Sequence, residues 1–411
     1  MLRTRLASLS SLASRSNLVS VILVGNALVW YFTVLRVLQI SQIGNGLVWV
    51  VHFTTLILAA VAGASFAKQM ERSRFLILWM VLGIVASMMI FALYDAPEIL
   101  VCLVSSFLGL SLGFGMPACM SYFTDSVPIE KRGRVSGLTM LACGIGIVAF
   151  GFPIFVDPNN LLLVGVILGI WRLSSLAVFL SAKDYRRIER KESVPSYKKV
   201  FGQRSFMLYF VPWVMFSFVN YLAVPKPPPA IEGYLGTVQT VFMGAAAVLG
   251  GFFIDTIGRK RIAIAGFAML GAGTAIIGFS GASTEGIHPS LLYFNSAIDG
   301  IAWGFLLVLF VLTLWGDLSH GSSADKFYAL GVMPFFASKL LELTVGSYIL
   351  NVATSTTQAS TTTLFSLTAF FLFLAVLPLV YAPETLPEKT MRERELKIYV
   401  EKAQEVAQEY Y

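Results

Sequence analysis

The stretch GGFFIDTIGRKR, residues 250–261, ends a long apolar run with an acid, a glycine and three consecutive cations. The next run, IAIAGFAMLGAGTAIIGF, residues 262–279, is again almost free of polar side chains. Apolar runs of about 18 residues or more are long enough to cross a bilayer as helices. Lipid offers backbone groups no partner outside the helix itself. The stretch is therefore predicted to be a short connection between two membrane-spanning helices.

Composition extends this interpretation to the whole chain. Of the 411 residues, 56% are hydrophobic and only 13% are charged, whereas soluble proteins carry about 25% charged residues. We predict an all-α polytopic membrane protein with twelve transmembrane helices. The spans are expected near residues 18–38, 46–66, 75–94, 99–119, 136–156, 161–181, 206–224, 237–254, 262–281, 290–315, 327–350 and 361–381.

The positive charges lie almost entirely on one side of this topology. With the N-terminus inside, 26 of the 30 lysines and arginines fall in cytoplasmic segments, and outer loops hold only Lys226. Arg36, Arg172 and Lys339 lie within spans. Because loop cations set orientation, both termini are predicted to lie in the cytoplasm. The membrane is predicted to be the plasma membrane. The net charge of +7 then reflects topology, and we predict no nucleic-acid partner. An organelle-targeting peptide is the alternative for the arginine-bearing first 17 residues.

Matching connections indicate an internal repeat. Gly63 and Gly251 follow spans 2 and 8, while Asp125 and Asp317 follow spans 4 and 10, at offsets of 188 and 192 residues. An even number of spans per half gives both halves the same orientation, as in a parallel repeat. The predicted organisation is a cytoplasmic arm (1–17), an N-terminal six-helix bundle (18–181), a cytoplasmic linker (182–205), a C-terminal six-helix bundle (206–381) and an amphipathic cytoplasmic tail (382–411).

These connections carry a family resemblance. GGFFIDTIGRKR resembles the G-x-x-x-D-x-x-G-R-[KR]-[KR] signature of the major facilitator superfamily, which also follows span 2 in that family. Here the loop after span 2 departs from it, with Ala67, Met70 and Glu71 at the acid, second glycine and first cation positions. YFTDSVPIEKRGR (122–134) resembles the family's loop after span 4, and APETLPEK (382–389) is similar to the ending of sugar porters. The resemblance implies a carrier, in a fold that can work as a monomer. The alternative of a membrane-embedded enzyme is disfavoured because no His/Asp/Glu metal cluster, Ser/His/Asp set or phosphate-cradling loop is apparent, so no cofactor, metal or nucleotide is predicted.

The opening stretch is predicted to act as a gate. Asp255 can face the positive N-terminus of a neighbouring helix, and Gly258 permits a left-handed turn. Arg259 and its two neighbours can pair with acids such as Asp317 or Asp325; the alternative is that they only anchor topology. The predicted gating set is Gly251, Asp255, Gly258, Arg259, Lys260, Arg261, Asp125, Arg132, Arg134 and Asp317.

Polar side chains within spans are the candidates for substrate or proton binding, because such groups are costly in lipid and tend to face a cavity or a partner. The resemblance implies that spans 1, 2, 4, 5, 7, 8, 10 and 11 line the cavity and that 3, 6, 9 and 12 are scaffold. The candidates are Asn26, Trp30, Thr33, Arg36, Tyr209, Trp213, Asn220, Gln239, Asn295, Asp299, Trp303, Lys339 and Glu342.

Structural roles compete with these assignments. Lys339 can neutralise Glu342 or pair with Asp299. Trp30, Trp213 and Trp303 can be packing residues. His52 is expected at the membrane interface, and Arg172 is expected to be paired with a partner that the sequence does not identify. Asp299 and Glu342 are the proton candidates.

The predicted function is secondary active or facilitative transport of a small organic solute by alternating access, with or without proton coupling. The alternative is a transporter-like sensor or scaffold that binds ligand without flux. A drug:proton antiporter is disfavoured because the N-terminal spans contain no acid and span 5 lacks the G-x-x-x-G-P-x-x-G-G pattern. A nucleotide-driven pump is disfavoured because G-x-x-x-x-G-K-[ST] is absent. The expected partners are the solute, protons and the lipid bilayer.

Overall fold

The computed structural model describes residues 15–41, 46–93, 96–156, 160–182, 193–222, 229–281, 288–319, 321–346, 348, 358–387 and 396. Most of the predicted N-terminal arm and of the amphipathic tail lie outside these ranges, as do Lys226 and residues 183–192 of the predicted linker.

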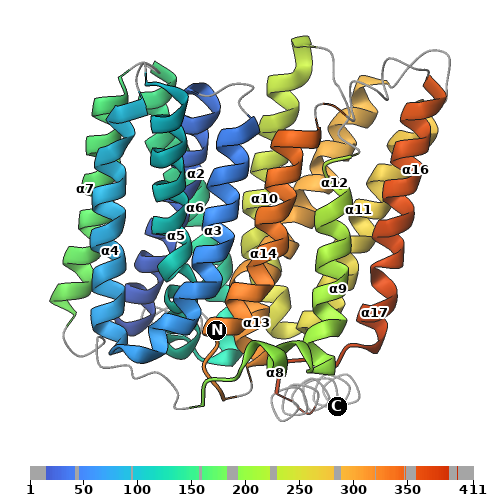
Figure 1. Ribbon diagram of the computed structural model, residues 1–411. Coiled ribbons are helices and arrows are strands. Elements are labelled where there is room, and N and C mark those ends of the chain that lie inside the picture. The colour runs from blue at the N-terminus through green and yellow to red at the C-terminus, as the bar shows by residue number, and fades with distance from the viewer. Residues whose placement is uncertain are drawn as a thin grey trace, which may run out of the picture.

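The first half of the chain forms one bundle of six long helices (Figure 1). They are α2 (Arg15–Ser41), α3 (Gly46–Phe66), α4 (Arg72–Met88), α5 (Glu98–Ser126), α6 (Arg132–Val156) and α7 (Leu161–Ser181). Short 3₁₀ turns follow three of them: η1 (Ala67–Gln69), η2 (Met89–Leu93) and η3 (Ile129–Lys131). Pro97 and Pro128 mark two of the breaks, since the residue before a proline disfavours helix.

The second half forms the other bundle, beside the first in Figure 1. Its helices are α9 (Arg204–Val219), α10 (Pro229–Thr256), α11 (Arg259–Gly281), α12 (Pro289–Leu307), α13 (Leu314–Leu318), α14 (Asp325–Leu341), α16 (Gln358–Leu374) and α17 (Val376–Tyr381). Two π-helical segments interrupt them, η5 (Val308–Thr313) and η6 (Glu342–Gly346). The short α8 (Tyr197–Phe201) connects the bundles at the end of the molecule where α2 begins and α17 ends (Figure 1).

Within the described ranges, 11 helices are long and apolar enough to cross a membrane. The predicted seventh span corresponds to α9, a shorter apolar helix that ends at Val219 rather than near residue 224. Together these helices confirm the predicted twelve-helix, two-bundle fold.

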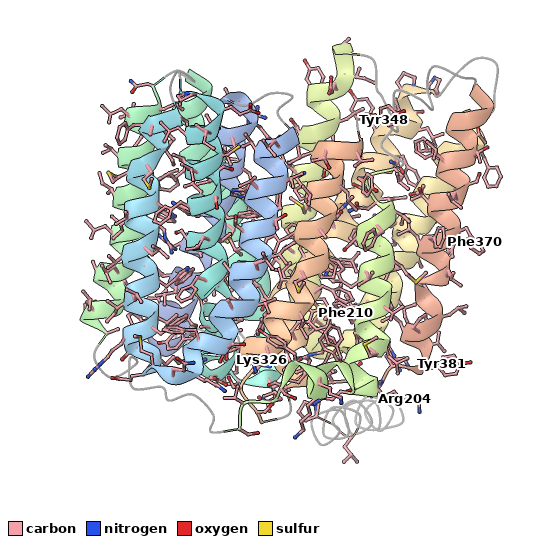
Figure 2. All side chains as sticks on the ribbon, viewed as in Figure 1. Arg204, Phe210, Lys326, Tyr348, Phe370 and Tyr381 are labelled. Carbon is pink, nitrogen blue, oxygen red and sulfur yellow. The ribbon has the colours of Figure 1, made fainter. Side chains whose placement is uncertain are left out.

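The outer surface is apolar, as expected of helices that face lipid. Phe279, Phe370 and Leu58 are more than half exposed on different helices, and Phe370 points away from the C-terminal bundle in Figure 2. Soluble monomers rarely expose contiguous apolar patches of this extent. A multi-pass membrane protein satisfies this distribution because the bilayer covers these side chains.

Candidate functional site: a buried charge cluster and a polar cavity

Asp255 lies in the last turn of α10 and binds the first turn of α6, from the other bundle. Its carboxylate accepts hydrogen bonds from the backbone nitrogens of Gly133 and Arg134, both at 2.9 Å, and its side chain is fully buried. The first turn of α6 contains no acid of its own. Asp255 therefore supplies the negative charge that a helix N-terminus favours, and it does so across the bundle interface.

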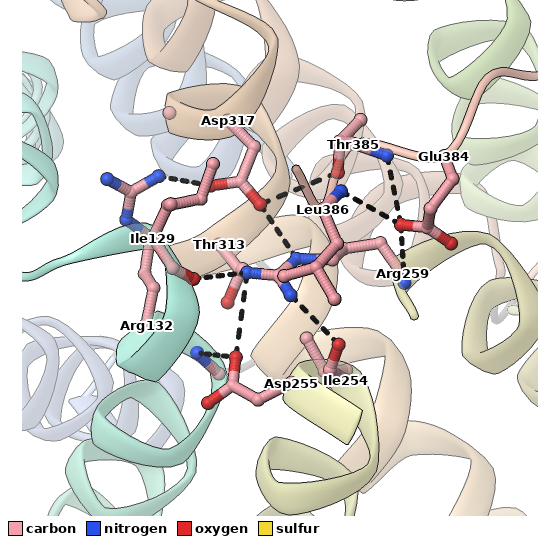
Figure 3. A network of polar contacts seen from close by, with 12 residues as sticks. Ile129, Arg132, Ile254, Asp255, Arg259, Thr313, Asp317, Glu384, Thr385 and Leu386 are labelled. Carbon is pink, nitrogen blue, oxygen red and sulfur yellow. Dashed lines mark hydrogen bonds and ion pairs between the residues drawn. The ribbon is translucent and has the colours of Figure 1, made fainter. Parts of the chain in front are cut away.

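Asp317, at the end of the α12–α13 run, lies between two arginines (Figure 3). It forms an ion pair with Arg132 of the N-terminal bundle and accepts a hydrogen bond from Arg259 Nε at 2.9 Å. Arg259 also lies 3.5 Å from Asp255 and donates at 2.6 Å to the Ile129 carbonyl, in the N-terminal bundle. Two acids and two arginines thus neutralise one another in a buried site. We call these four residues, Arg132, Asp255, Arg259 and Asp317, the latch.

Glycines let the two bundles approach closely beside the latch. A Cβ atom on Gly251 of α10 would lie 2.3 Å from the Gly133 oxygen of α6. A Cβ on Gly137 would lie 2.4 Å from the Ala247 oxygen. Side chains at these positions would push the helices apart, so the capping contact of Asp255 depends on these glycines.

Sequence reasoning missed the role of Glu384, although it lies in the APETLPEK stretch that was compared with sugar porters. Its carboxylate accepts from the backbone nitrogens of Arg259 at 2.9 Å and Lys260 at 3.2 Å, which caps α11. Gly258 adopts the predicted left-handed conformation, with φ of 111°, and a Cβ there would lie 2.4 Å from the Glu384 carboxylate. An acid shortly after the last span, facing a basic loop, was the signal that could have identified it.

The other predicted gating residues have contacts of a different kind. Asp125, the repeat counterpart of Asp317, pairs with Arg72 at 2.8 Å inside the N-terminal bundle. The ammonium of Lys260 donates to the Val380 carbonyl within the C-terminal bundle, and Arg261 is exposed. Asp325, the alternative partner for the cations, accepts from Ser323 at 2.6 Å instead.

A cavity of about 510 Å³ lies within the C-terminal bundle. Helices α9, α10, α11, α12, α14 and α16 all contribute to its lining, together with η6. Seven of the predicted substrate or proton residues line it: Asn220, Gln239, Asn295, Asp299, Trp303, Lys339 and Glu342. The polar residues Glu232, Thr274, Ser296 and Thr368 line it too, although the sequence analysis did not select them.

Two polar contacts organise the cavity wall. Gln239 donates its side-chain amide to Asp299, and Lys339 contacts both Glu342 oxygens at 2.8 Å. The predicted Lys339–Glu342 pair is therefore present, whereas the alternative Asp299–Lys339 pair is not formed. An amide rather than a cation is the partner of Asp299 on the neighbouring helix.

The lining corrects one implication of the family resemblance. Spans 9 and 12 were expected to be scaffold, yet α11 contributes Gly273 and Thr274, and α16 contributes Phe365 and Thr368. The wall of this cavity therefore includes α11 and α16.

The N-terminal candidates do not line this cavity, and three of them have partners inside their own bundle. Asn26 donates to the Trp171 carbonyl, and Trp30 Nε1 donates to Ser87 Oγ at 2.7 Å. Thr33 donates to Val29 of its own helix, while Arg36 is exposed.

Arg172 and His52 also have partners within the N-terminal bundle. The guanidinium of Arg172 donates to Asn26 and lies 4.5 Å above the ring of Trp79. Its partners are therefore an amide and aromatic faces rather than an acid. His52 contacts the Ser105 carbonyl and is buried between α3 and α5; its expected depth at the membrane interface stays a prediction.

Two C-terminal candidates are packing residues. Trp213 stacks on Phe310 with ring centroids 4.6 Å apart and an interplanar angle of 3°. The hydroxyl of Tyr209 donates to the Pro383 carbonyl. Both side chains are fully buried between the cavity and the latch end of the bundle, so the predicted alternative of packing holds for Trp213.

Neither a protein-family model nor a curated protein sequence matches the chain. Solved structures of major facilitator superfamily transporters share its fold at low sequence identity. The proton:xylose symporter XylE, bound to 6-bromo-6-deoxy-D-glucose, superposes with a TM-score of 0.68 and 15% identity, covering 92% of this chain and 97% of XylE. A bacterial homologue of the iron transporter ferroportin, in an outward-facing state, superposes with a TM-score of 0.69 and 15% identity, covering 89% of this chain and 98% of that protein.

The human organic anion transporter MFSD10 gives a TM-score of 0.61 and 13% identity, covering 89% of this chain and 99% of that protein. The chain therefore has the major facilitator fold over nearly its whole length.

Proposed function

We propose that the chain is a secondary carrier that moves a small organic solute by alternating access. The carrying observation is a closed latch between the bundles at one end, combined with a polar cavity in a chain of this fold. The similar structures are described as a sugar symporter, an iron transporter homologue and an organic anion transporter. These descriptions favour transport as a class and do not choose a solute. The excess of loop cations favours a cytoplasmic latch end.

One helical run connects the cavity to the latch. The α12–η5–α13 run, Pro289–Leu318, carries Asp299 in the cavity and Asp317 in the latch, on the order of 25 Å apart at 1.5 Å per residue. The π-helical segment Val308–Thr313 lies between them, and π-helical turns often occur at functional sites. In this mechanism, solute bound at Asp299 changes the position of Asp317, so binding shifts the equilibrium between the closed and the broken latch.

Asp299 is the residue through which a proton would be coupled to transport. It is half-buried at the cavity wall, and its contact is the Gln239 amide rather than a cation. Glu342 is the weaker candidate, because Lys339 already neutralises it.

A sensor that binds ligand without flux is the second candidate. The observation that favours it is Ala67 at the position where the family signature has an acid, so only one of the two repeats supplies the latch acid. This reading predicts ligand binding and conformational change without movement of solute across the membrane.

Flux into proteoliposomes separates these functions. The full chain would be reconstituted, with internal pH and labelled solute followed while sugars, organic acids, amino acids and amines are supplied outside. Wild type would be compared with Asp299→Asn and Glu342→Gln. We expect saturable uptake of one solute class, with any accompanying pH change lost in Asp299→Asn and retained in Glu342→Gln. Binding of a solute with no flux of any class would overturn the carrier proposal and leave the sensor.

A further inference from the structure

The charges in the cavity wall do not balance. Among the described residues, three carboxylates line it, on Glu232, Asp299 and Glu342, and the one ammonium that lines it is that of Lys339. Because both Glu342 oxygens contact Lys339 at 2.8 Å, that pair is neutral. Within the part of the chain that the structure describes, Asp299 has no cationic partner.

The surroundings of Asp299 make this imbalance significant. Its carboxylate accepts one hydrogen bond, from the uncharged amide of Gln239. A carboxylate withdrawn from water needs a counter-charge, a proton or several donors to remain favourable. A positively charged ligand would provide the counter-charge that the described residues do not.

The rest of the wall suits the body of such a ligand. Phe216, Trp303 and Phe365 contribute aromatic surface, and aromatic faces attract organic cations. Thr368 also lines the cavity; the residue is 1% exposed, and its hydroxyl finds no hydrogen-bond partner among the described residues. Buried hydroxyls usually have a partner, so this one is available to a polar group of the ligand or to its bound water.

We infer that the cavity binds a small organic cation, an amine on an apolar or aromatic body, with Asp299 as its counter-ion. This inference deepens the proposed carrier function by assigning a substrate class to the same cavity. The volume of about 510 Å³ falls in the range of roughly 300–1,000 Å³ that is typical of small-molecule sites. A neutral sugar would offer Asp299 hydroxyl donors but no counter-charge, and an anion would meet a net negative wall.

The test is binding to the purified full chain in detergent, measured by isothermal titration calorimetry with isosteric probes. Tryptamine would be compared with the neutral tryptophol and the anionic indole-3-acetate, and choline with the neutral 3,3-dimethyl-1-butanol; D-xylose represents sugars. A charge-assisted contact predicts that a cation binds about 10- to 100-fold more tightly than its neutral isostere. Asp299→Asn should remove this preference while binding of the neutral probe stays within about threefold.

Control variants keep the result interpretable. Asp299→Glu retains the charge and should retain the preference, which guards against a folding defect in Asp299→Asn. Glu232→Gln removes an acid whose residue is exposed at the cavity wall, and it should keep most of the preference if Asp299 is the counter-ion.

Three outcomes would overturn the inference: equal binding of cations and neutral isosteres, tighter binding of indole-3-acetate or xylose, or a cation preference that survives Asp299→Asn. The carrier proposal fails differently. Cation binding without flux in proteoliposomes would contradict the carrier and leave the cation site standing. Flux of a neutral solute that is independent of Asp299 would contradict the cation site and leave the carrier standing.

Discussion

The bundles meet along two seams at the latch end, and the two seams use different chemistry. In the α6–α10 seam, Asp255 of one bundle caps the first turn of α6 in the other. In the α3–α14 seam, the repeat position holds Ala67, which is fully buried. The difference follows from the helix of the other bundle that each position faces. The first turn of α14 contains its own acid, Asp325, whereas that of α6 has none.

Hydrogen bonds and a cation–π contact contribute to the second seam. The hydroxyl of Tyr197, in α8, donates to the Val61 carbonyl of α3 at 2.6 Å, and its ring lies 4.7 Å below the ammonium of Lys326. Thr124 of α5 and Tyr328 of α14 share a hydrogen bond at 2.8 Å. Burial raises the pKa of Tyr197 above its ordinary value, so this hydroxyl remains a donor at neutral pH. The first seam is therefore closed by buried acid–arginine pairs and a helix cap, whereas hydrogen bonds and a cation–π contact contribute to the second.

One measurement can follow both seams. Nitroxide labels on Glu130→Cys and Arg261→Cys would report the distance between the bundles at the latch end by pulsed electron paramagnetic resonance. Both native side chains are exposed, and the three native cysteines would be replaced by serine. The fraction of closed molecules is the quantity compared below.

The largest effect is expected for Asp317→Asn in the first seam. It leaves the buried Arg132 and Arg259 without their shared acid, and removing one partner of a buried pair costs about 3–5 kcal/mol. We expect the short-distance population to be lost. Adding Arg132→Gln should recover part of it, because fewer unpaired charges then remain buried. A closed population unchanged in Asp317→Asn would show that the latch does not hold the seam.

A smaller effect is expected for Asp255→Ala, which removes the cap of α6 and should destabilise the closed state by about 1–2 kcal/mol.

The matched change in the other seam is Ala67→Asp. Because Ala67 is fully buried and α14 already carries Asp325, the new carboxylate should lower the closed fraction. An increase with Ala67→Asp would mean that the second seam lacks an acid that it could use.

Tyr197→Phe tests the α3–α14 seam. It removes one hydrogen bond to Val61, worth about 0.5–1.5 kcal/mol net, and keeps the ring under Lys326. The closed fraction should fall modestly, and the change should be insensitive to salt, unlike that of variants at exposed charges. A decrease as large as that of Asp317→Asn would make the linker, rather than the latch, the main contact between the bundles.

The smallest effect is expected for Lys260→Gln. Lys260 belongs to the signature, but its ammonium contacts Val380 of its own bundle in an exposed position. Exposed charges contribute about 0–1 kcal/mol, so the distance distribution should be unchanged. A shift towards open molecules would assign gating to a residue that the structure connects only within one bundle.

Much of the gate could be predicted from neighbours in sequence, and less of the cavity could. Asp255 and Gly258 lie at a loop whose length and composition require a helix end, so their conformations followed locally. The partner of Arg172 was not predictable, because Asn26 lies 146 residues away and no sequence pattern connects the two helices. Glu384 was missed for the same reason, since its contact with Arg259 spans 125 residues.

The sequence by itself determined that this chain crosses the membrane repeatedly and how its halves repeat. The length of apolar runs and the distribution of loop cations are local properties, and they directly determine which segments span the bilayer and in which orientation. Only the tertiary structure decided which polar side chains meet. Trp30 and Asn26 turn into their own bundle, while Asp299 and Lys339 share a cavity wall with different partners. Helix rotation and packing decide this, because each polar group in a membrane takes the nearest partner that the assembled bundle offers.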